Sequence, residues 1–163
     1  MLRSEVGMQQ DKWDSFFLKQ AHAVAATFSK DPDRKVGAVI YRDSYPLSFG
    51  YNGIIRGYPD DLVFASDKLV YTEHAEKNAI FNAARNNINI MGASIACTFH
   101  PCHECARAIV QSGIKRLVCP PPLDEDIAGK WASSIDAAQR MFSVCGVDVY
   151  LVCRPDVPVL QIK

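Results

Sequence analysis

Two short motifs in the chain combine residue types that bind metals and move protons. The first is His-Ala-Glu at positions 74–76, and the second is Pro-Cys-His-Glu-Cys at positions 101–105. Each is expected at the start of a helix, where exposed amides and the helix dipole favour the thiolate form of cysteine. Thiolates from Cys102 and Cys105 and a neutral imidazole from His74 supply three ligands of a tetrahedral zinc ion. The fourth position stays open for water, as in catalytic zinc sites.

Glu76 is expected beside this cluster rather than within it. It follows His74 by two positions, so its side chain does not share the helix face that presents the imidazole. A carboxylate that approaches a metal-activated water from the side performs general acid and base catalysis. Alone, Cys-x-x-Cys is also typical of structural zinc and thiol redox sites, and His-x-Glu is usually a solvated face. Together, and in this order, the two motifs favour catalytic zinc.

The other histidines and cysteines are expected to have other roles. His22 is expected on a helix face, and His100 and His103 flank the metal loop as candidates to line a pocket. The remaining cysteines fall in or beside predicted strands and a helix end, where cysteine is typically a small buried residue: Cys97, Cys119, Cys145 and Cys153. No signal-like apolar stretch occurs in the first twenty residues. A reducing compartment, and hence the cytoplasm, is therefore expected.

The hydrophobic pattern predicts the elements that position these motifs. Apolar periodicity predicts helices over residues 11–29, 72–86 with Thr72 as N-cap, 102–112 and 130–144, and strands over 36–41, 47–51, 93–99, 115–119 and 147–152. Residues 53–70 show no period and are expected to form a loop, and residues 154–163 an extended tail. The first two strands favour an antiparallel hairpin, and the alternating second half favours parallel strands. We expect a three-layer α/β/α fold with a five-stranded mixed sheet.

The length and the net charge of the chain constrain its domain organisation and its binding partners. A chain of 163 residues is expected to form one domain over residues 1–163. Lysine plus arginine and aspartate plus glutamate each total 18, so the formal net charge is zero. Without a basic surplus, nucleic acid and anionic membrane surfaces are not expected as partners. No run approaches the roughly 18 apolar residues of a membrane-spanning helix.

The chain resembles the deoxycytidylate deaminases of the cytidine deaminase superfamily. The resemblance runs from about Val36 to Val152. The zinc motifs are those of the whole superfamily, whose signature is His-x-Glu followed by Pro-Cys-x-x-Cys. Further support comes from Val-Gly-Ala-Val at 36–39, Asn-Ala-Ile at 78–80, and the positions Ala106, Ile109, Gly113 and Ile114. Within this superfamily, Gly-Tyr-Asn-Gly at 50–53 resembles the branch whose members act on nucleotides.

The resemblance implies hydrolysis of deoxycytidine monophosphate (dCMP) to deoxyuridine monophosphate (dUMP) and ammonia, which supplies the precursor of thymidylate. His74, Cys102 and Cys105 would bind Zn²⁺. Glu76 would protonate N3 of cytosine while activated water attacks C4, and would then carry a proton to the departing amine. The backbone of Ala75 resembles the amide that meets the base carbonyl.

The resemblance also suggests contacts to the sugar and the phosphate. Asn52 resembles the carboxamide that holds the sugar; the alternative is a turn residue chosen for its tolerance of the left-handed conformation. Arg34 and Lys35 are candidates for the phosphate by position alone. The alternative for both is a solvated loop charge.

Assembly and regulation are further implications of the resemblance. Many relatives are hexamers, activated by deoxycytidine triphosphate (dCTP) and inhibited by thymidine triphosphate (dTTP). A homo-oligomer is therefore expected, with residues Gly50, Tyr51, Asn52 and Gly53 as a candidate allosteric loop and Mg²⁺ accompanying a triphosphate. The chain departs from many relatives at 119–123, which reads Cys-Pro-Pro-Pro-Leu where they carry tyrosines, and it has no set of ligands for a second, structural zinc.

Two other functions remain open from the sequence. One is a deaminase of another base or nucleoside, such as the wobble adenosine of transfer RNA, which the zero net charge disfavours. The other is a non-catalytic, zinc-stabilised module that binds nucleotides or proteins. That second function requires a fourth protein ligand to close the metal site, whereas the sequence offers three.

Overall fold

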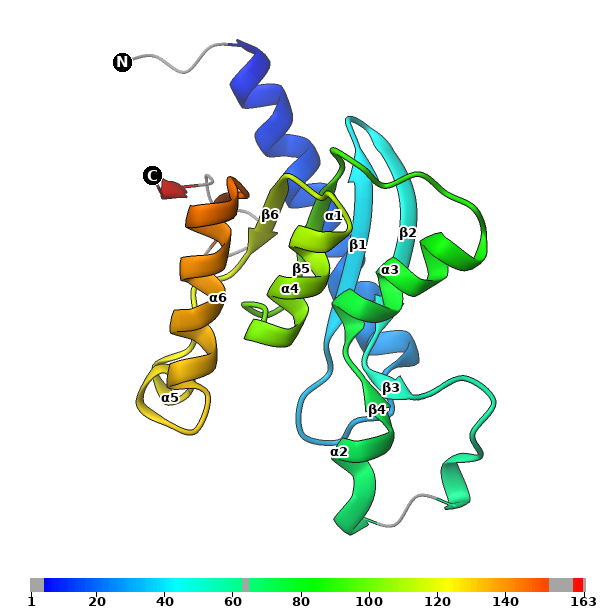
Figure 1. The fold of residues 1–163 in the computed structure, drawn as a ribbon. Helices are drawn as coiled ribbons and strands as arrows, with labels where there is room; N and C mark the ends of the chain where they lie inside the picture. Colours follow the sequence, from blue (N-terminus) through cyan, green and yellow to red (C-terminus); the bar gives the residue numbers. More distant parts are fainter. Residues whose placement is uncertain (1–4, 63–64, 153–159, 163) are drawn as a thin grey trace.

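A mixed β-sheet lies between two layers of helices in the computed structural model, which describes residues 5–62, 65–152 and 160–162 (Figure 1). The helices are α1 (Glu5–Phe28), α2 (Lys68–Tyr71), α3 (Ala75–Arg85), α4 (His103–Gln111), α5 (Asp124–Ala128) and α6 (Ala132–Cys145). The strands are β1 (Gly37–Arg42), β2 (Tyr45–Tyr51), β3 (Gly53–Ile54), β4 (Thr72–Glu73), β5 (Ser94–Cys97), β6 (Arg116–Cys119), β7 (Asp148–Leu151) and β8 (Leu160–Ile162).

The strand order of the main sheet is β2-β1-β5-β6-β7-β8. Strands β1 and β2 form the expected antiparallel hairpin, and β5, β6 and β7 are parallel, as the alternation of strands and helices predicts. Strand β1 joins the two parts by pairing antiparallel with β5. The predicted α/β fold and its five-stranded mixed sheet are confirmed, and β8 adds a short antiparallel strand at the β7 edge.

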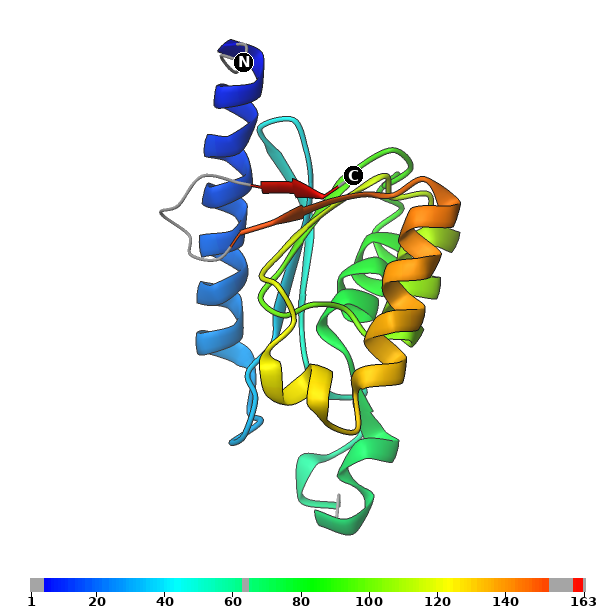
Figure 2. The same cartoon turned by 90° about the vertical axis from the view of Figure 1, so that its left-hand side faces the viewer.

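Each face of the sheet has its own apolar core. Helix α1 covers one face, where Phe17 and Leu18 pack with Val39 and Val118. Helices α3, α4 and α6 cover the other face, whose core includes residues from all three helices and from β1, β5 and β6. Figure 2 shows α1 on one side of the sheet and these three helices on the other. No described helix has the length and hydropathy that crossing a membrane requires.

The sequence prediction was wrong around the start of α3. Thr72 is not its N-cap, because Thr72 and Glu73 form β4, which pairs antiparallel with β3, and His74 is the N-cap residue. The segment predicted as a loop at 53–70 contains β3, two short 3-10 turns and the start of α2. Strands of two residues and single helical turns are too short to produce a hydrophobic period. Helix α5 was missed for the same reason.

The remaining cysteines do not behave alike. Cys97 and Cys119 are fully buried, as predicted. Cys145 is exposed, contrary to the prediction, because it is the last residue of α6, where the helix ends at the left-handed Gly146. Cys153 lies outside the described residues, as does most of the tail predicted as extended, of which residues 160–162 form β8.

Two glycines allow helices to approach the hairpin closely. A Cβ at Gly37 would lie 2.1 Å from the carbonyl oxygen of Ala21 in α1. A Cβ at Gly50 would lie 2.3 Å from the carbonyl oxygen of Ala75 in α3. Only glycine permits such approaches without a shift of backbone. Gly50 therefore fixes how near the first turn of α3, which carries Glu76, lies to β2.

Candidate metal and catalytic site

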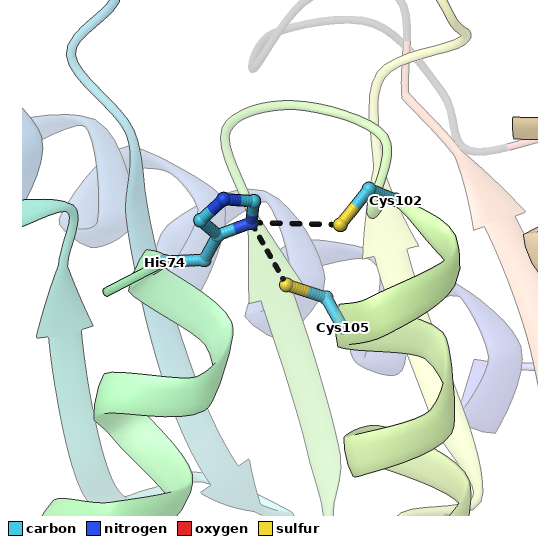
Figure 3. Close-up of side chains that lie close together, drawn as sticks. All are labelled: His74, Cys102 and Cys105. Atoms are coloured by element: carbon cyan, nitrogen blue, oxygen red, sulfur yellow. Dashed lines mark hydrogen bonds between the residues drawn. The ribbon is translucent and has the colours of Figure 1, made fainter. Parts of the chain in front are cut away.

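Three donor side chains meet where α3 and α4 begin. His74 is the N-cap residue of α3, Cys102 is the N-cap residue of α4, and Cys105 lies in the first turn of α4. The sulfurs of Cys102 and Cys105 lie 3.5 Å and 3.3 Å from Nδ1 of His74 (Figure 3). All three donor atoms lie within 4.8 Å of one another. The structure thus brings together the three residues that the sequence predicted as ligands, and two sulfurs with one imidazole nitrogen suit zinc.

The two cysteines of the cluster have pKa values shifted in opposite directions. The hydrogen bond from Cys105 is the largest factor that lowers the pKa of Cys102, to about 3, and His74 adds to it against the effect of burial. The same hydrogen bond, together with burial, raises the pKa of Cys105. The hydrogen bond with Cys102 likewise raises the pKa of His74. The hydrogen bond from Cys105 therefore favours the thiolate of Cys102, which is the form that binds a metal.

Glu76 lies next to this cluster in the first turn of α3. Its side chain is buried, and its Oε2 accepts a hydrogen bond from the thiol of Cys105 across 3.4 Å. Burial is the main factor that raises the pKa of Glu76 above that of an ordinary glutamate. A raised pKa brings a carboxyl group nearer to the range in which it both accepts and donates protons at neutral pH.

Asn52 holds the segment between α1 and β1. Its Oδ1 accepts hydrogen bonds from the hydroxyl of Ser29 (2.6 Å) and the backbone N–H of Val36 (2.8 Å). Its Nδ2 donates to the carbonyl of Arg34 across 2.9 Å. Within the described residues, positive φ angles outside glycine occur only at Asp43 and Asn87. The alternative that Asn52 was selected for a left-handed turn is therefore wrong.

Ser29 is a buried residue that orients Asn52, and no sequence pattern indicated this role. It is buried beyond the end of α1, and its hydroxyl both donates to Asn52 and accepts the N–H of Asp31 at 3.3 Å. A serine after a helix and before Asp-Pro reads as an ordinary loop residue. No periodicity or spacing could have indicated its contact with Asn52, which depends on the tertiary fold.

The two phosphate candidates differ in their surroundings. The guanidinium of Arg34 lies over the ring of Phe99, 4.9 Å from its centroid, and pairs with Glu125 of α5 at 3.1 Å. Phe99 precedes the loop that leads to Cys102. Lys35 is exposed. Arg34 is thus held beside the segment that leads into the donor cluster.

The histidines outside the cluster support the start of α4 or lie apart from it. The hydroxyl of Ser134 in α6 accepts the backbone N–H of His103 at 3.1 Å and lies 2.7 Å from its Nδ1. His100 is partly buried, and burial lowers its pKa. Whether His100 and His103 line a pocket stays a prediction. His22 is on an exposed face of α1, as expected.

The Gly-Tyr-Asn-Gly segment spans the end of β2 and the start of β3. The ring of Tyr51 stacks on Phe28, with centroids 5.5 Å apart, and its carbonyl accepts a hydrogen bond from Nδ2 of Asn78 in α3 at 2.8 Å. Together with the close approach of Gly50, these contacts fix the segment to both α1 and α3.

Fold and cluster together define a class of protein. A three-layer α/β fold in which two helix N-termini bring together one histidine, two cysteines and a buried glutamate is that of the nucleobase deaminases. The comparisons with known proteins agree. The chain belongs to the cytidine and deoxycytidylate deaminase family, because residues 11–120 match the model of the "Cytidine and deoxycytidylate deaminase zinc-binding region". The chain is thus a deaminase.

Individual relatives resemble most of the chain. It is 39% identical over 140 residues to an "Uncharacterized deaminase in luxG 3'region" of Aliivibrio fischeri, a match that covers 85% of this chain and 92% of that protein. It is 34% identical over 145 residues to the deoxycytidylate deaminase of Mus musculus, which covers 83% of this chain and 77% of the mouse protein. The crystal structure of dCMP deaminase from cyanophage S-TIM5 in apo form is similar, with a TM-score of 0.65, 25% identity, and coverage of 91% of this chain and 98% of that chain.

Proposed function

We propose that this chain is a zinc-dependent deaminase that hydrolyses dCMP to dUMP and ammonia. In this proposal His74, Cys102 and Cys105 bind Zn²⁺, and Glu76 is the catalytic proton carrier. The observation that carries it is the buried carboxylate of Glu76 beside a cluster to which the described residues contribute three metal donors. Three protein donors leave a zinc position for water, as hydrolysis needs. The similarity to deoxycytidylate deaminases supports dCMP as the substrate.

When bound, zinc supplies Lewis-acid activation of the water that attacks C4, the ring carbon that carries the amine. Glu76 accepts one proton of that water and delivers it to N3 of the ring. It then transfers the second proton to the amine nitrogen. A C–O bond forms at C4, the C–N bond breaks, and ammonia departs. Because Glu76 is buried, it exchanges these protons with the substrate and the attacking water rather than with bulk water.

We assign the substrate contacts to residues around the same cluster. The backbone amide of Ala75, at the N-terminus of α3, meets the base carbonyl. Asn52 donates a hydrogen bond to the sugar. The contacts of its carboxamide use both lone pairs of Oδ1 and one of the two Nδ2 hydrogens, so the second Nδ2 hydrogen is the one assigned to the sugar. Arg34 binds the phosphate, with Lys35 as a second cation nearby. The contacts of Arg34 with Phe99 and Glu125 support this assignment, because they hold its guanidinium near the loop that leads to the donor cluster.

The proposal extends to organisation and regulation. Residues 1–163 form one domain that assembles as a homo-oligomer in the cytoplasm and provides the precursor of thymidylate. Exposed aromatic side chains at Phe28, Phe49 and Phe81 support self-association. Gly50, Tyr51, Asn52 and Gly53 form an allosteric loop for dCTP and dTTP, with Mg²⁺ bound to the triphosphate. The contacts of this loop with α3 support such a role, because α3 carries Glu76.

The decisive experiment measures ammonia release from dCMP by the zinc-loaded protein, with and without dCTP and dTTP. A parallel panel contains deoxycytidine, cytidine monophosphate and transfer RNA. We expect dCMP to be the preferred substrate. Preferential deamination of transfer RNA would instead assign an adenosine-type activity. Bound zinc without deamination of any substrate would indicate the non-catalytic module.

A further inference from the structure

Lys77 pairs with two glutamates that flank the donor residues in the sequence. It occupies α3 one turn after His74. Its Nζ lies 2.8 Å from Oε1 of Glu73, directly before His74, and 3.8 Å from Oε2 of Glu104, which lies on α4 between Cys102 and Cys105. A single ammonium group thus contacts the segment that carries the histidine and the helix that carries the cysteines.

Glu73 connects Lys77 to the backbone of the histidine. The same Oε1 that pairs with Lys77 accepts the backbone N–H of His74 at 3.0 Å. The side chain of His74 makes no capping hydrogen bond to α3, so its imidazole remains available as a ligand. About four-fifths of both side chains is buried, with 22% of Lys77 and 19% of Glu73 exposed. Such a shielded pair restricts geometry more than an exposed pair does.

Glu104 connects Lys77 to the cysteines. Its other oxygen, Oε1, pairs with Arg107 at 2.6 Å, one turn further along α4, so that the carboxylate contacts a cation on each helix. Lys77 therefore links the segment that carries His74 to the helix that carries the cysteines.

We propose that Lys77 is a positioning residue of the metal centre, which holds the strand–helix junction of His74 against the helix of Cys102 and Cys105. The inference rests on the proposed zinc-dependent function. Because the donors come from two separate helices, a link between those helices places them before the metal arrives. Removal of groups that orient metal ligands commonly lowers metal affinity by about 10- to 100-fold.

The test compares the zinc affinity of purified variants by competition with a chromophoric chelator. Lys77→Met removes the charge and keeps a long side chain, and we expect its zinc affinity to fall by about tenfold. Lys77→Arg restores the cation, and we expect it to recover most of the loss. The matched control is Arg140→Met, which breaks an exposed i,i+4 pair with Asp136 on α6 and should leave zinc affinity unchanged. Spectra of the cobalt-substituted proteins report directly on donor geometry.

Each result decides the inference. Weaker zinc binding and an altered cobalt spectrum in Lys77→Met, with recovery in Lys77→Arg, support it. Wild-type affinity and spectrum in Lys77→Met overturn the positioning role and leave the proposed function intact. A wild-type chain that binds no zinc overturns both. If Lys77→Met does not fold, Glu104→Gln, at a half-exposed position, takes its place: weaker zinc binding supports the link, and unchanged binding overturns it.

Discussion

The carboxylate of Glu76 accepts a hydrogen bond from the thiol of Cys105, with Oε2 and Sγ 3.4 Å apart. This contact joins the first turns of α3 and α4, which the chain separates by a strand and a loop. Glu76 is nevertheless not one of the three donors that could share a metal. A carboxylate that touches one donor without belonging to the donor set is placed to move protons rather than to bind the ion.

Glu76→Gln is therefore expected to separate catalysis from metal binding. Glutamine keeps the size of the side chain but cannot accept and release a proton, so kcat for dCMP should fall by about 10²- to 10⁴-fold. Zinc content, measured by elemental analysis, should stay at the wild-type level. Asp136→Asn, an equally conservative change on the exposed face of α6, should retain full activity. A Glu76→Gln variant with wild-type turnover would exclude Glu76 as the proton carrier.

Asn52→Ala is expected to destabilise the fold as well as impair activity. It removes three hydrogen bonds from the segment between α1 and β1 and leaves the N–H of Val36 without its acceptor. Loss of such partners should lower the free energy of unfolding by about 2–4 kcal/mol, measured by urea denaturation. Asn82→Ala, at a partly exposed amide on α3, should lose about 1 kcal/mol or less. Equal losses in the two variants would contradict a special role for Asn52 in holding this segment.

The sequence was sufficient to predict the sheet, the long helices and the three donors. These features depend on local signals: apolar periodicity along the chain, and motifs whose members are a few positions apart at helix starts. The start of α3 was misplaced because β4 is stabilised by pairing with β3, which lies nearly twenty positions earlier, and not by its own residues.

Contacts between distant segments account for the rest of what the sequence could not show. Ser29 and Lys77 have unremarkable neighbours in the sequence, yet the fold brings Ser29 to Asn52 and Lys77 to Glu104. Their importance follows from charge and burial in the folded state. Cys145 illustrates the opposite error: its residue type suggested burial, whereas its position at the end of α6 exposes it.

Gly50→Ala and Gly53→Ala form a matched pair within the Gly-Tyr-Asn-Gly segment. A Cβ at Gly50 would lie 2.3 Å from the backbone oxygen of Ala75 and 2.4 Å from the backbone nitrogen of Ala79, so α3 must shift. A Cβ at Gly53 would meet only the ring of Tyr51, at 3.3 Å. Urea denaturation should show a loss of about 3 kcal/mol for Gly50→Ala and less than about 1 kcal/mol for Gly53→Ala. A fully stable Gly50→Ala protein would contradict the close approach of β2 and α3.

Tyr41 should make the fold sensitive to alkaline pH. Burial, together with the charge and hydrogen bond of Asp14, raises the pKa of Tyr41 well above 10, whereas the adjacent Arg116 acts in the opposite direction. The unfolded chain therefore loses this proton first. The contribution of Tyr41 to the free energy of unfolding is complete below about pH 10 and is lost as pH rises toward the folded pKa. At pH 11 about 1 kcal/mol of it is lost.

Urea denaturation should show that the free energy of unfolding declines less from pH 9 to 11 in Tyr41→Phe than in wild type. The exposed Tyr45→Phe should decline as wild type does, and identical declines in all three would refute this role of Tyr41.

Arg34 and Lys35 can be distinguished by comparing a nucleotide with its nucleoside. Arg34 is held by Phe99 and Glu125, whereas Lys35 is an exposed side chain, so we expect Arg34 to provide the phosphate contact. A charge-assisted hydrogen bond contributes about 1.5–3 kcal/mol, so Arg34→Gln should raise KM for dCMP by about 10- to 100-fold. Deoxycytidine has no phosphate, so its kcat/KM should change by less than about threefold, and Lys35→Gln should affect either substrate little. Steady-state kinetics measure these parameters for each of the two variants with each of the two substrates. An equal loss for nucleotide and nucleoside in Arg34→Gln would show that Arg34 supports the loop through Phe99 rather than binding phosphate, and a selective loss in Lys35→Gln would transfer the role to the lysine.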